Sequence, residues 1–525
     1  MLLFYNGTIH TMDAAHPKPS AVVVNDDGVI EFVGSLSALP TQGRVKRIDL
    51  GGRTLIPGFN DAHVHIWKLG LLLTVQVDAR ASAAPDISAI VELFRKRAIS
   101  TAPGTWLTGR GYNEAVLPER RHLTRADLDL ASTDHPIALT RTCGHMIVAN
   151  SRALELAGIS ADTPNPPGGV IVRDERGEPT GLLQETAMGL INKVLPDPDD
   201  ATLGHAIREA MYHQLRLGIT SATDPLLTPA HLRVYRRLEA DGDLPVRVNA
   251  LPIRRPDGTE KITYPLPEKY VSDTLRIDCV KFFADGGLSG ATAAISQPYK
   301  VTGDRGVLRF ETDDLLDLMW QAHDAGFRIA THAIGDVALD QVIGVYEELH
   351  RRKPGLRHRI EHLGLPSADH LRRLKAINAI AVPQSVFIHA LGATFRRYLP
   401  DPFYPRLYPI RDMLDAGLTV ALSSDAPVVP DDNPLLGMKA AVDRCDADGE
   451  PLTPEQAITP YEALYAYTMG GAIASGDAGS RGSITPGKWG DLVVLSGDPL
   501  AAAPDGLLDI AVDQTFVGGR LVYER

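Results

Sequence analysis

The stretch LIPGFNDAHVH, residues 55–65, decides the fold of this chain. It begins as an apolar run typical of a buried strand and ends in His-Val-His, which places His63 and His65 two positions apart. Because successive side chains of a strand point to opposite faces, we expect both imidazoles on the same face. Two neutral imidazoles at one strand end form half of a site for a divalent metal.

Further apolar runs follow this stretch and alternate with helical segments, such as 312–325 and 336–351. This alternation is typical of βα units around a parallel sheet, and eight strands predict an α/β fold of the (β/α)8 TIM-barrel type. The expected strands are 55–65, 218–224, 246–253, 279–286, 328–336, 358–364, 379–385 and 419–427.

The first connection, from His65 to Gly218, is far longer than one helix needs. We therefore expect an inserted subdomain at about 70–200, with a helix near 87–98 and a hairpin within 170–183. Both ends of the chain read instead as short β segments separated by glycine turns, and neither end has enough strands for a stable sheet. The sequence thus predicts a discontinuous small β-sandwich domain, 1–57 with 480–525, beside a barrel domain, 58–479.

Composition excludes several classes of protein. The chain has 525 residues, is 44% hydrophobic and carries a net charge of −12, the wrong sign for neutralising nucleic-acid phosphates. Its three cysteines, Cys143, Cys279 and Cys445, are far apart and predict neither a disulfide framework nor a zinc knuckle. The first residues lack the features of a signal peptide, and no stretch has the length of a membrane span. We expect a cytoplasmic protein that binds neither nucleic acid nor membrane.

Three more metal-binding residue types stand at strand ends: His332 in THAIGD, His362 in RIEH and Asp425 in SSDAP. Barrel enzymes build their active sites at the carboxyl ends of the strands, so these side chains could converge with the two histidines of the first strand. His358 begins its strand at the opposite end, and we do not expect it to bind the metal.

Lys281 lies in the middle of the apolar strand DCVKFFADG, where a lone ammonium is strongly disfavoured and its pKa is depressed. A neutral amine can react with carbon dioxide to form an anionic carbamate, which could bridge two metal ions. The alternative is an ion pair between Lys281 and Asp285 or another carboxylate.

These residues resemble those of the amidohydrolase superfamily, and within it the family 3 group of YtcJ-like enzymes and N-substituted formamide deformylases. The resemblance covers nearly the whole chain. It rests on PGFNDAHVH, CGHMIVANSRAL, VKFFADGGLSGATAA, THAIGD, the IEH strand, SSDAP and PGKWGDLVVLSGDP, in this order.

The resemblance implies that His63 and His65 bind one metal ion, that His332 and His362 bind a second, and that carbamylated Lys281 bridges them. Asp425 would contact the first ion and transfer a proton during catalysis. The resemblance thus implies two divalent metal ions per chain and a homodimer. The nitrogen-rich ligands favour zinc, with manganese and iron as alternatives. A metal ion lowers the pKa of bound water, so the implied reaction is hydrolysis of a non-peptide amide or formamide bond of a small molecule by hydroxide.

Substrate contacts are expected from strand-end loops and from the insertion. The candidates are Tyr112 in GRGYNE, His145 in CGHM, Glu185 in LLQETA and Gly287 in the loop 286–292, and a purely structural role for each is an equally good interpretation.

Three alternative functions stay open. A mononuclear deaminase of heterocyclic bases shares the His-x-His pattern, but Lys281 argues against it. So does the residue three positions after His332, which is Gly335 where such deaminases have a glutamate. An esterase or lactonase could use the same metal site, and a catalytically silent scaffold could keep the fold.

Overall fold

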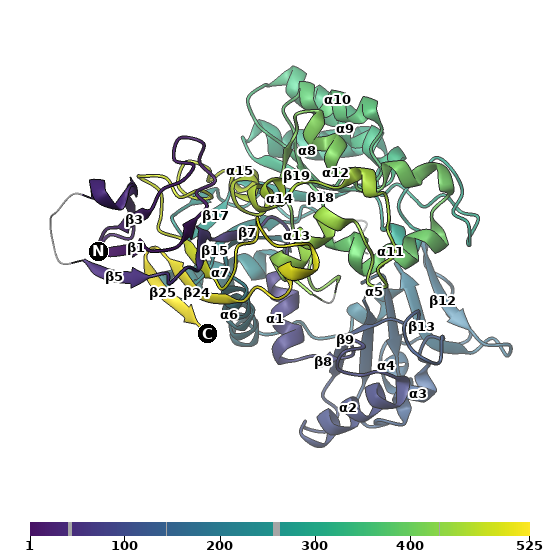
Figure 1. Cartoon of the computed structure of the whole chain (residues 1–525). Helices are drawn as coiled ribbons and strands as arrows, with labels where there is room; N and C mark the ends of the chain where they lie inside the picture. Colours follow the sequence, from purple (N-terminus) through teal and green to yellow (C-terminus); the bar gives the residue numbers. More distant parts are fainter. Residues whose placement is uncertain (40–44, 143, 256–262, 430) are drawn as a thin grey trace.

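The computed structural model of the chain describes residues 1–39, 45–142, 144–255, 263–429 and 431–525. It is a mixed α/β fold, with a strand-rich region at the two termini, a helix-covered central body and a separate subdomain formed by the insertion (Figure 1). Cys143 lies outside the described residues, and Cys279 and Cys445 are free thiols.

The central body contains two sheets whose main strands run parallel. In the first sheet β17, β15, β14 and β7 are parallel and β16 pairs antiparallel at its edge. In the second sheet all neighbours are parallel, in the order β18-β19-β20-β21-β22. The bounds are β7 Phe59–Asp61, β14 Ile219–Leu227, β15 Arg247–Pro252, β16 Tyr270–Val271, β17 Leu275–Ile277, β18 Cys279–Phe283, β19 Arg328–Ala333, β20 Arg359–His362, β21 Ile380–Val382 and β22 Thr419–Val420.

Backbone contacts join the two sheets at two places. A parallel bridge pairs Ile253, just after β15, with Lys281 of β18. On the other side, the amide of Ala62 after β7 donates to the carbonyl of Leu422 after β22 (3.4 Å). The strand positions and their parallel order agree with the expected βα units, while closure of the eight strands into a barrel stays a prediction.

The expected first strand, 55–65, is divided in the structure. Thr54–Pro57 forms β6 in a terminal sheet, and Phe59–Asp61 forms β7 in the central body. Gly58 lies at the change of sheet, where a Cβ atom would stand 2.0 Å from Oγ1 of Thr220, so only glycine fits this close approach. His63 and His65 therefore follow the strand rather than lying on it, which corrects the expectation that strand alternation aligns their imidazoles.

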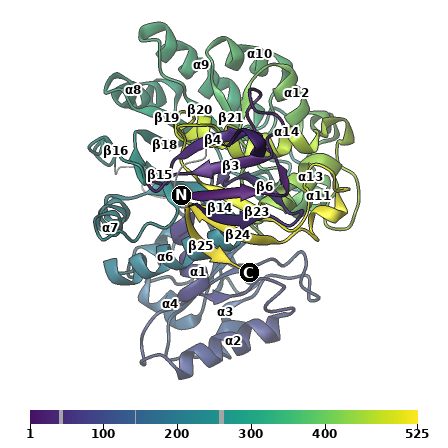
Figure 2. The ribbon, with the colours of Figure 1, turned by 60° about the vertical axis from the view of Figure 1, so that its left-hand side comes forward.

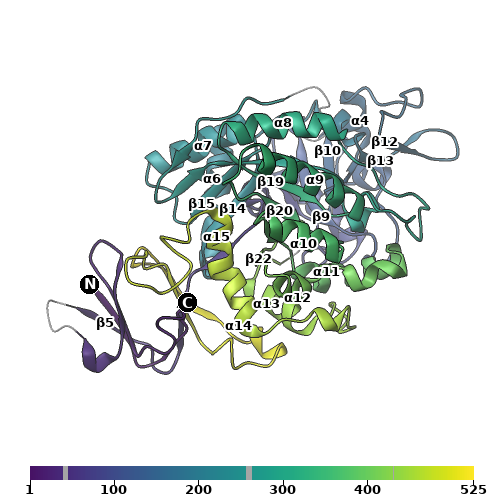
Figure 3. The same ribbon diagram turned by 90° about the horizontal axis from the view of Figure 1, so that it is seen from above.

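Helices cover the outside of the central strands (Figures 1 and 3). In α9 (Asp336–Arg352), the buried residues recur at helical spacing and pack into the main hydrophobic cluster, while acidic and basic residues at its two ends complement the helix dipole. Among the described residues, no helix combines the length and apolar character needed to cross a membrane. The other helices of this body are α1 Ile66–Thr74, α6 Asp200–Arg216, α7 Pro229–Ala240, α8 Thr312–Asp324, α10 Ala368–Ala376, α11 Val386–Tyr398, α12 Ile410–Asp415, α13 Pro434–Asp443, α14 Pro460–Tyr465 and α15 Gly471–Ser475.

The insertion folds as a six-stranded sheet in the order β12-β13-β11-β10-β9-β8 (lower right in Figure 1). The expected helix and hairpin are confirmed as α2 and as the antiparallel pair β12 and β13. The insertion has its own apolar cluster, which includes Phe94, Leu139 and Tyr112. The bounds are β8 Val77–Asp78, α2 Ile87–Ile99, β9 Leu107–Tyr112, α3 Arg125–Asp129, β10 Ile137–Arg141, β11 Met146–Ala149, α4 Ser151–Leu156, β12 Gly169–Arg173, β13 Pro179–Glu185 and α5 Met188–Asn192.

Strands from both ends of the chain share one terminal sheet, in the order β2-β6-β23-β24-β25, and the two termini lie on the same side of the molecule (Figure 2). The sheet β4-β3-β1-β5 packs against it, since one apolar cluster contains residues of both sheets and Phe4 meets Phe516 edge to face. The predicted domain boundaries stay predictions. The bounds are β1 Leu2–Tyr5, β2 Thr8–Ile9, β3 Ala21–Val24, β4 Ile30–Gly34, β5 Lys46–Asp49, β6 Thr54–Pro57, β23 Leu492–Leu495, β24 Val512–Val517 and β25 Arg520–Glu524.

His358 has a structural position, at the start of β20 and away from the other strand-end histidines. Its Nδ1 accepts from the amide of Ile329 (3.1 Å), and its Nε2 lies 2.9 Å from Nδ1 of His323, whose Nε2 donates to the carbonyl of Lys353 (2.8 Å). This chain of hydrogen bonds requires both imidazoles to be neutral. Burial lowers the pKa of His358 from 6.5 to about 3.

We predict that His358 makes the stability of the protein fall in mild acid. The unfolded chain protonates His358 near pH 6.5 and the folded chain does not, so the contribution is full above pH 6.5 and falls by about 2 kcal/mol from pH 7 to pH 5. His358→Asn keeps an acceptor and a donor but no titrating group. Its stability deficit against the wild type should therefore shrink between pH 8 and pH 5 in calorimetric unfolding. The exposed His205→Asn is the control, and a deficit of His358→Asn that does not change with pH would contradict the prediction.

Candidate metal centre

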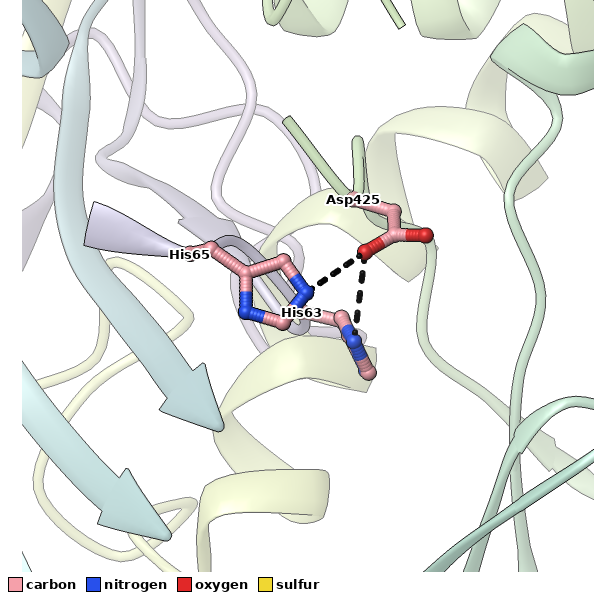
Figure 4. A group of neighbouring side chains, drawn as sticks. All are labelled: His63, His65 and Asp425. Carbon is pink, nitrogen blue, oxygen red and sulfur yellow. Dashed lines mark ion pairs between the residues drawn. The ribbon is translucent and has the colours of Figure 1, made fainter. Parts of the chain in front are cut away.

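Two of the predicted histidines meet the predicted aspartate after the strands β7 and β22 (Figure 4). Nε2 of His63 lies 3.4 Å and Nε2 of His65 lies 3.2 Å from the same carboxylate oxygen of Asp425. All three side chains are buried, and one ligand atom from each lies within 4.8 Å of the others. The geometry is that of a metal-binding triad.

Asp61 holds the two loops of this triad together. Its carboxylate accepts from the amide of His63 (3.1 Å) and from both the amide (3.1 Å) and the hydroxyl (2.6 Å) of Ser424. In addition, the amide of Asp425 donates to the carbonyl of His63 (2.7 Å). These bonds explain how residues of irregular backbone can hold their side chains in a fixed arrangement.

Lys281 is fully buried on β18, and its Nζ has no hydrogen-bond partner among the described residues. Burial lowers the pKa of this amine to about 8. The alternative ion pair with Asp285 is not found, because Asp285 instead accepts the amides of Ala294, Ile334 and Gly335 at 2.8–3.1 Å. A buried polar group without a partner is costly, so this amine is a candidate for modification or for contact with a bound group.

His332 and His362 stand beside the triad at the ends of β19 and β20. The ring centroid of His362 lies 5.0 Å from that of His63 and 4.5 Å from that of His332. Nδ1 of His362 donates to Oε1 of Gln384 (2.6 Å), and Nε2 of His332 donates to the carbonyl of Gly286 (2.9 Å). Each ring thus has one nitrogen fixed by the protein and a second nitrogen left as a candidate ligand.

Two of these residues have unusual backbone conformations. His362 has φ of 72° and Asp425 has φ of 57°, in the left-handed region that residues other than glycine rarely adopt. Such strain persists only where the surrounding structure holds it, and it concentrates at functional sites. At His362 the turn of the backbone allows consecutive residues, Glu361 and His362, both to reach His63.

The protonation of three of the four imidazoles suits metal binding. Burial opposes the charged form of His63, but Glu361 and Asp425 raise its pKa above the ordinary value. Burial lowers the pKa of His65 to about 3 and of His362 to about 4, and it holds the pKa of His332 well below its ordinary value. These three rings are therefore neutral at pH 7 and keep a lone pair. Burial by itself would raise the pKa of Asp425, but His63 and His65 hold it well below its usual range, so the carboxylate is ionised.

Glu361 is a functional residue that sequence reasoning missed. It is fully buried and accepts from Nδ1 of His63 (2.5 Å) and from the guanidinium of Arg359 (2.6 and 3.0 Å). The carboxylate fixes the His63 tautomer with Nε2 turned toward Asp425. Burial alone would raise the pKa of Glu361, but Arg359 and His63 hold it far below the usual range. Carboxylates behind metal-binding histidines have this role in many proteins.

A cavity opens over the triad between the central body and the insertion. The expected candidates His145 and Gly287 line it, and Glu185 contacts His145, whose Nδ1 donates to the Glu185 carboxylate (3.1 Å). Tyr112 is not among the lining residues. Its ring lies in the core of the insertion, and its hydroxyl lies 3.1 Å from Nδ1 of His122. The sequence analysis missed Lys68, Arg110 and the apolar residues Phe387, Leu391 and Phe395, which also line the cavity.

The donor set fits a divalent metal. Four buried imidazoles, three of them neutral at pH 7, and an ionised carboxylate are ligands typical of zinc sites, and a hydrogen bond from the other ring nitrogen of a histidine, as at His63, is the usual supporting contact. The unpartnered Lys281 amine is consistent with a further ligand formed on this side chain.

Comparison with known proteins identifies the family of the chain. A family model described as the amidohydrolase family matches residues 46–523. Over the whole chain, the sequence is 32% identical to the "Putative amidohydrolase YtcJ" of Bacillus subtilis, covering 99% of that protein. It is 30% identical to the N-substituted formamide deformylase of Arthrobacter pascens, covering 98% of it.

A solved structure is also similar. An uncharacterized metal-dependent hydrolase from Pyrococcus horikoshii superimposes with a TM-score of 0.78 at 28% identity, covering 96% of this chain and 99% of that one. The chain belongs to the amidohydrolase family, and the prediction that it is an amidohydrolase is confirmed.

We predict that Glu361→Gln loosens metal binding. The amide is a weaker acceptor for Nδ1 of His63, so the ring loses its fixed tautomer and basicity, and the metal affinity should fall about 10- to 100-fold. Competition with a chelator, followed by elemental analysis, measures this affinity.

Asp224→Asn is the matched control, since Asp224 is an equally buried carboxylate that accepts from the hydroxyl of Tyr235 (2.5 Å) and from no histidine in the described structure. Equal losses of metal affinity in both variants would show that Glu361 has no specific effect on His63.

Proposed function

We propose that the protein hydrolyses a carbon–nitrogen bond of a small amide or formamide, with two zinc ions held by the side chains described above. The convergence of His63, His65 and Asp425 beside the unpartnered Lys281 amine carries this proposal. The relative from Arthrobacter pascens, whose name is N-substituted formamide deformylase, supports the choice of bond.

In this proposal His63, His65 and Asp425 hold one ion and His332 and His362 hold the other, with Lys281 as a carbamate between them. Bound metal would supply a hydroxide at neutral pH and polarise the scissile carbonyl. The carbamate would also remove the cost of a buried amine without a partner, because it replaces a cation-forming group with two acceptor oxygens.

Asp425 is the proposed proton carrier. Its carboxylate is ionised and buried, and it lies at the metal triad. It would accept the proton of the attacking water and then donate it to the departing nitrogen, which leaves as a neutral amine. No covalent bond between enzyme and substrate is needed.

The cavity walls would bind the substrate. We propose that His145, oriented by Glu185, and the backbone at Gly287 contact it, while Tyr112 acts only through the packing of the insertion. We also propose that the eight central strands close into a barrel beside a discontinuous sandwich domain, and that the chain forms a homodimer in the cytoplasm.

The first test combines metal analysis with activity. Purified protein should contain close to two zinc ions per chain by plasma mass spectrometry. It should hydrolyse at least one of a panel of N-substituted formamides, aryl amides and simple esters, and a chelator should abolish the activity.

The outcomes separate the alternatives. One metal per chain with release of ammonia from heterocyclic bases would favour a deaminase, and hydrolysis of esters alone would favour an esterase or lactonase. A protein that neither keeps metal after reconstitution nor hydrolyses any compound of the panel would be a scaffold.

A second test concerns Lys281. Lys281→Ala should lower the metal content from about two ions per chain, and short carboxylic acids should restore part of it by taking the place of the carbamate. In wild-type protein supplied with ¹³C-labelled carbon dioxide, a carbamate signal should appear in the ¹³C NMR spectrum and be missing in the variant. Full metal content in Lys281→Ala and no carbamate signal would make Lys281 a structural residue.

A further inference from the structure

The wall of the cavity contains two cations that the proposed chemistry does not use. Lys68 lies in the first turn of α1, directly after the first metal-binding histidines, and Arg110 lies on β9 of the insertion. The only carboxylate among the lining residues is Asp425, which belongs to the metal triad. Apart from the metal site, the charged wall of the described cavity is therefore cationic.

Lys68 has an aromatic neighbour but no anionic partner in the described structure, since its Nζ lies 5.4 Å from the centroid of the Trp67 ring. A cation in the first turn of a helix opposes the helix dipole, and no carboxylate of the described residues forms an ion pair with it. The nearby Asp224 accepts from the hydroxyl of Tyr235 (2.5 Å), and its other carboxylate oxygen has no hydrogen-bond partner among the described residues.

Lys68 and Arg110 also act on each other. Burial and the like charge of Arg110 lower the pKa of Lys68 to about 7. Two cations that share a poorly solvated cavity repel each other, and an anion between or beside them relieves both the repulsion and the loss of hydration. Because Lys68 has no ion pair among the described residues, this part of the cavity wall favours a bound anion.

A different part of the wall is apolar. Phe387, Leu391 and Phe395 recur at a spacing of four residues along α11, so they share one face of this helix, and all three line the cavity. Tyr408 and Val428 also line the cavity and add apolar surface. An apolar group of the substrate would find its contacts here.

We infer that the substrate is amphiphilic: an amide that carries an anionic group, bound by Lys68 and Arg110, and an apolar group, bound along α11. The amide bond in this inference rests on the proposed function, whereas the anion site rests only on the residues that line the cavity. Lys68 and Arg110 would therefore determine the specificity for an anionic substrate.

Binding is tested on the full-length protein with its metal, using 2-phenylethanesulfonate and its neutral analogue, methyl 2-phenylethyl sulfone. A sulfonate is a poor metal ligand, so it reports on the cations rather than on the metal. Calorimetric titration should show about 10-fold or tighter binding of the sulfonate. Lys68→Met should remove most of this preference, and Lys68→Arg should keep it.

Two control variants complete the titration. Lys96→Met, at an exposed lysine of α2, should leave both affinities unchanged. Leu391→Asn should weaken the sulfonate and the sulfone by the same factor, because both probes place the same phenyl group on α11. Equal binding of the two probes by the wild type, or no binding of either at millimolar concentration, would overturn the inference.

Kinetics separates this inference from the proposed function. N-formylphenylalanine and N-formyl-2-phenylethylamine differ only by a carboxylate, and kcat/KM should be at least 10-fold higher for the former, chiefly through KM. In Lys68→Met this ratio should fall toward one. Equal hydrolysis of both compounds by the wild type would leave the proposed function intact and overturn the anion site. Tight sulfonate binding without any hydrolysis would leave the anion site intact and overturn the proposed function.

Discussion

The arrangement of the metal centre depends on one buried carboxylate, that of Glu361. It is ionised without any exposure to solvent, which is costly unless the charge is paired and fully hydrogen-bonded. Arg359 supplies the opposite charge from the same strand and His63 supplies the remaining donor. Strand β20 thereby fixes the tautomer of His63, which follows β7 and is far away in the sequence, and it places its own His362 beside the same ring. The left-handed backbone at His362 is the local strain that this double function requires.

The metal centre and the substrate walls come from different parts of the chain. The candidate ligands stand on or just after strands of the central body, where parallel neighbours and buried helices restrict movement. The cavity is completed by the insertion, through Arg110 and His145, and by α11. The central body therefore holds the candidate ligands rigidly. The cavity walls come in part from the insertion, which is stabilised by its own apolar cluster.

Much of the candidate site could be predicted from the sequence because metal-binding residue types occur at the ends of the apolar runs that form strands. His332, His362 and Lys281 were placed correctly by the apolar runs that contain them. For His63 and His65 the residue types indicated the metal site, but the expected strand 55–65 was wrong. The chain changes sheets at Gly58, where it meets Thr220, and a contact with such a distant segment cannot be read from the local sequence. Glu361 did leave a signal: Arg359 and Glu361 are opposite charges two positions apart in a short apolar strand. Gln384 and Lys68 left none, since an amide in a loop and a lysine in a helix are ordinary until tertiary structure brings them to the cavity.

The terminal sheet has a consequence for how the protein is made. Strand β6 is synthesised long before its partner β23, because the whole central body lies between them in the sequence. At roughly 5–20 residues per second, the unpaired edge of β6 must wait for on the order of a minute. During that time it is an apolar strand with free backbone donors and acceptors, open to pairing with other nascent chains. Synthesis of β23, rather than folding of the central strands, therefore sets the moment at which this edge becomes protected.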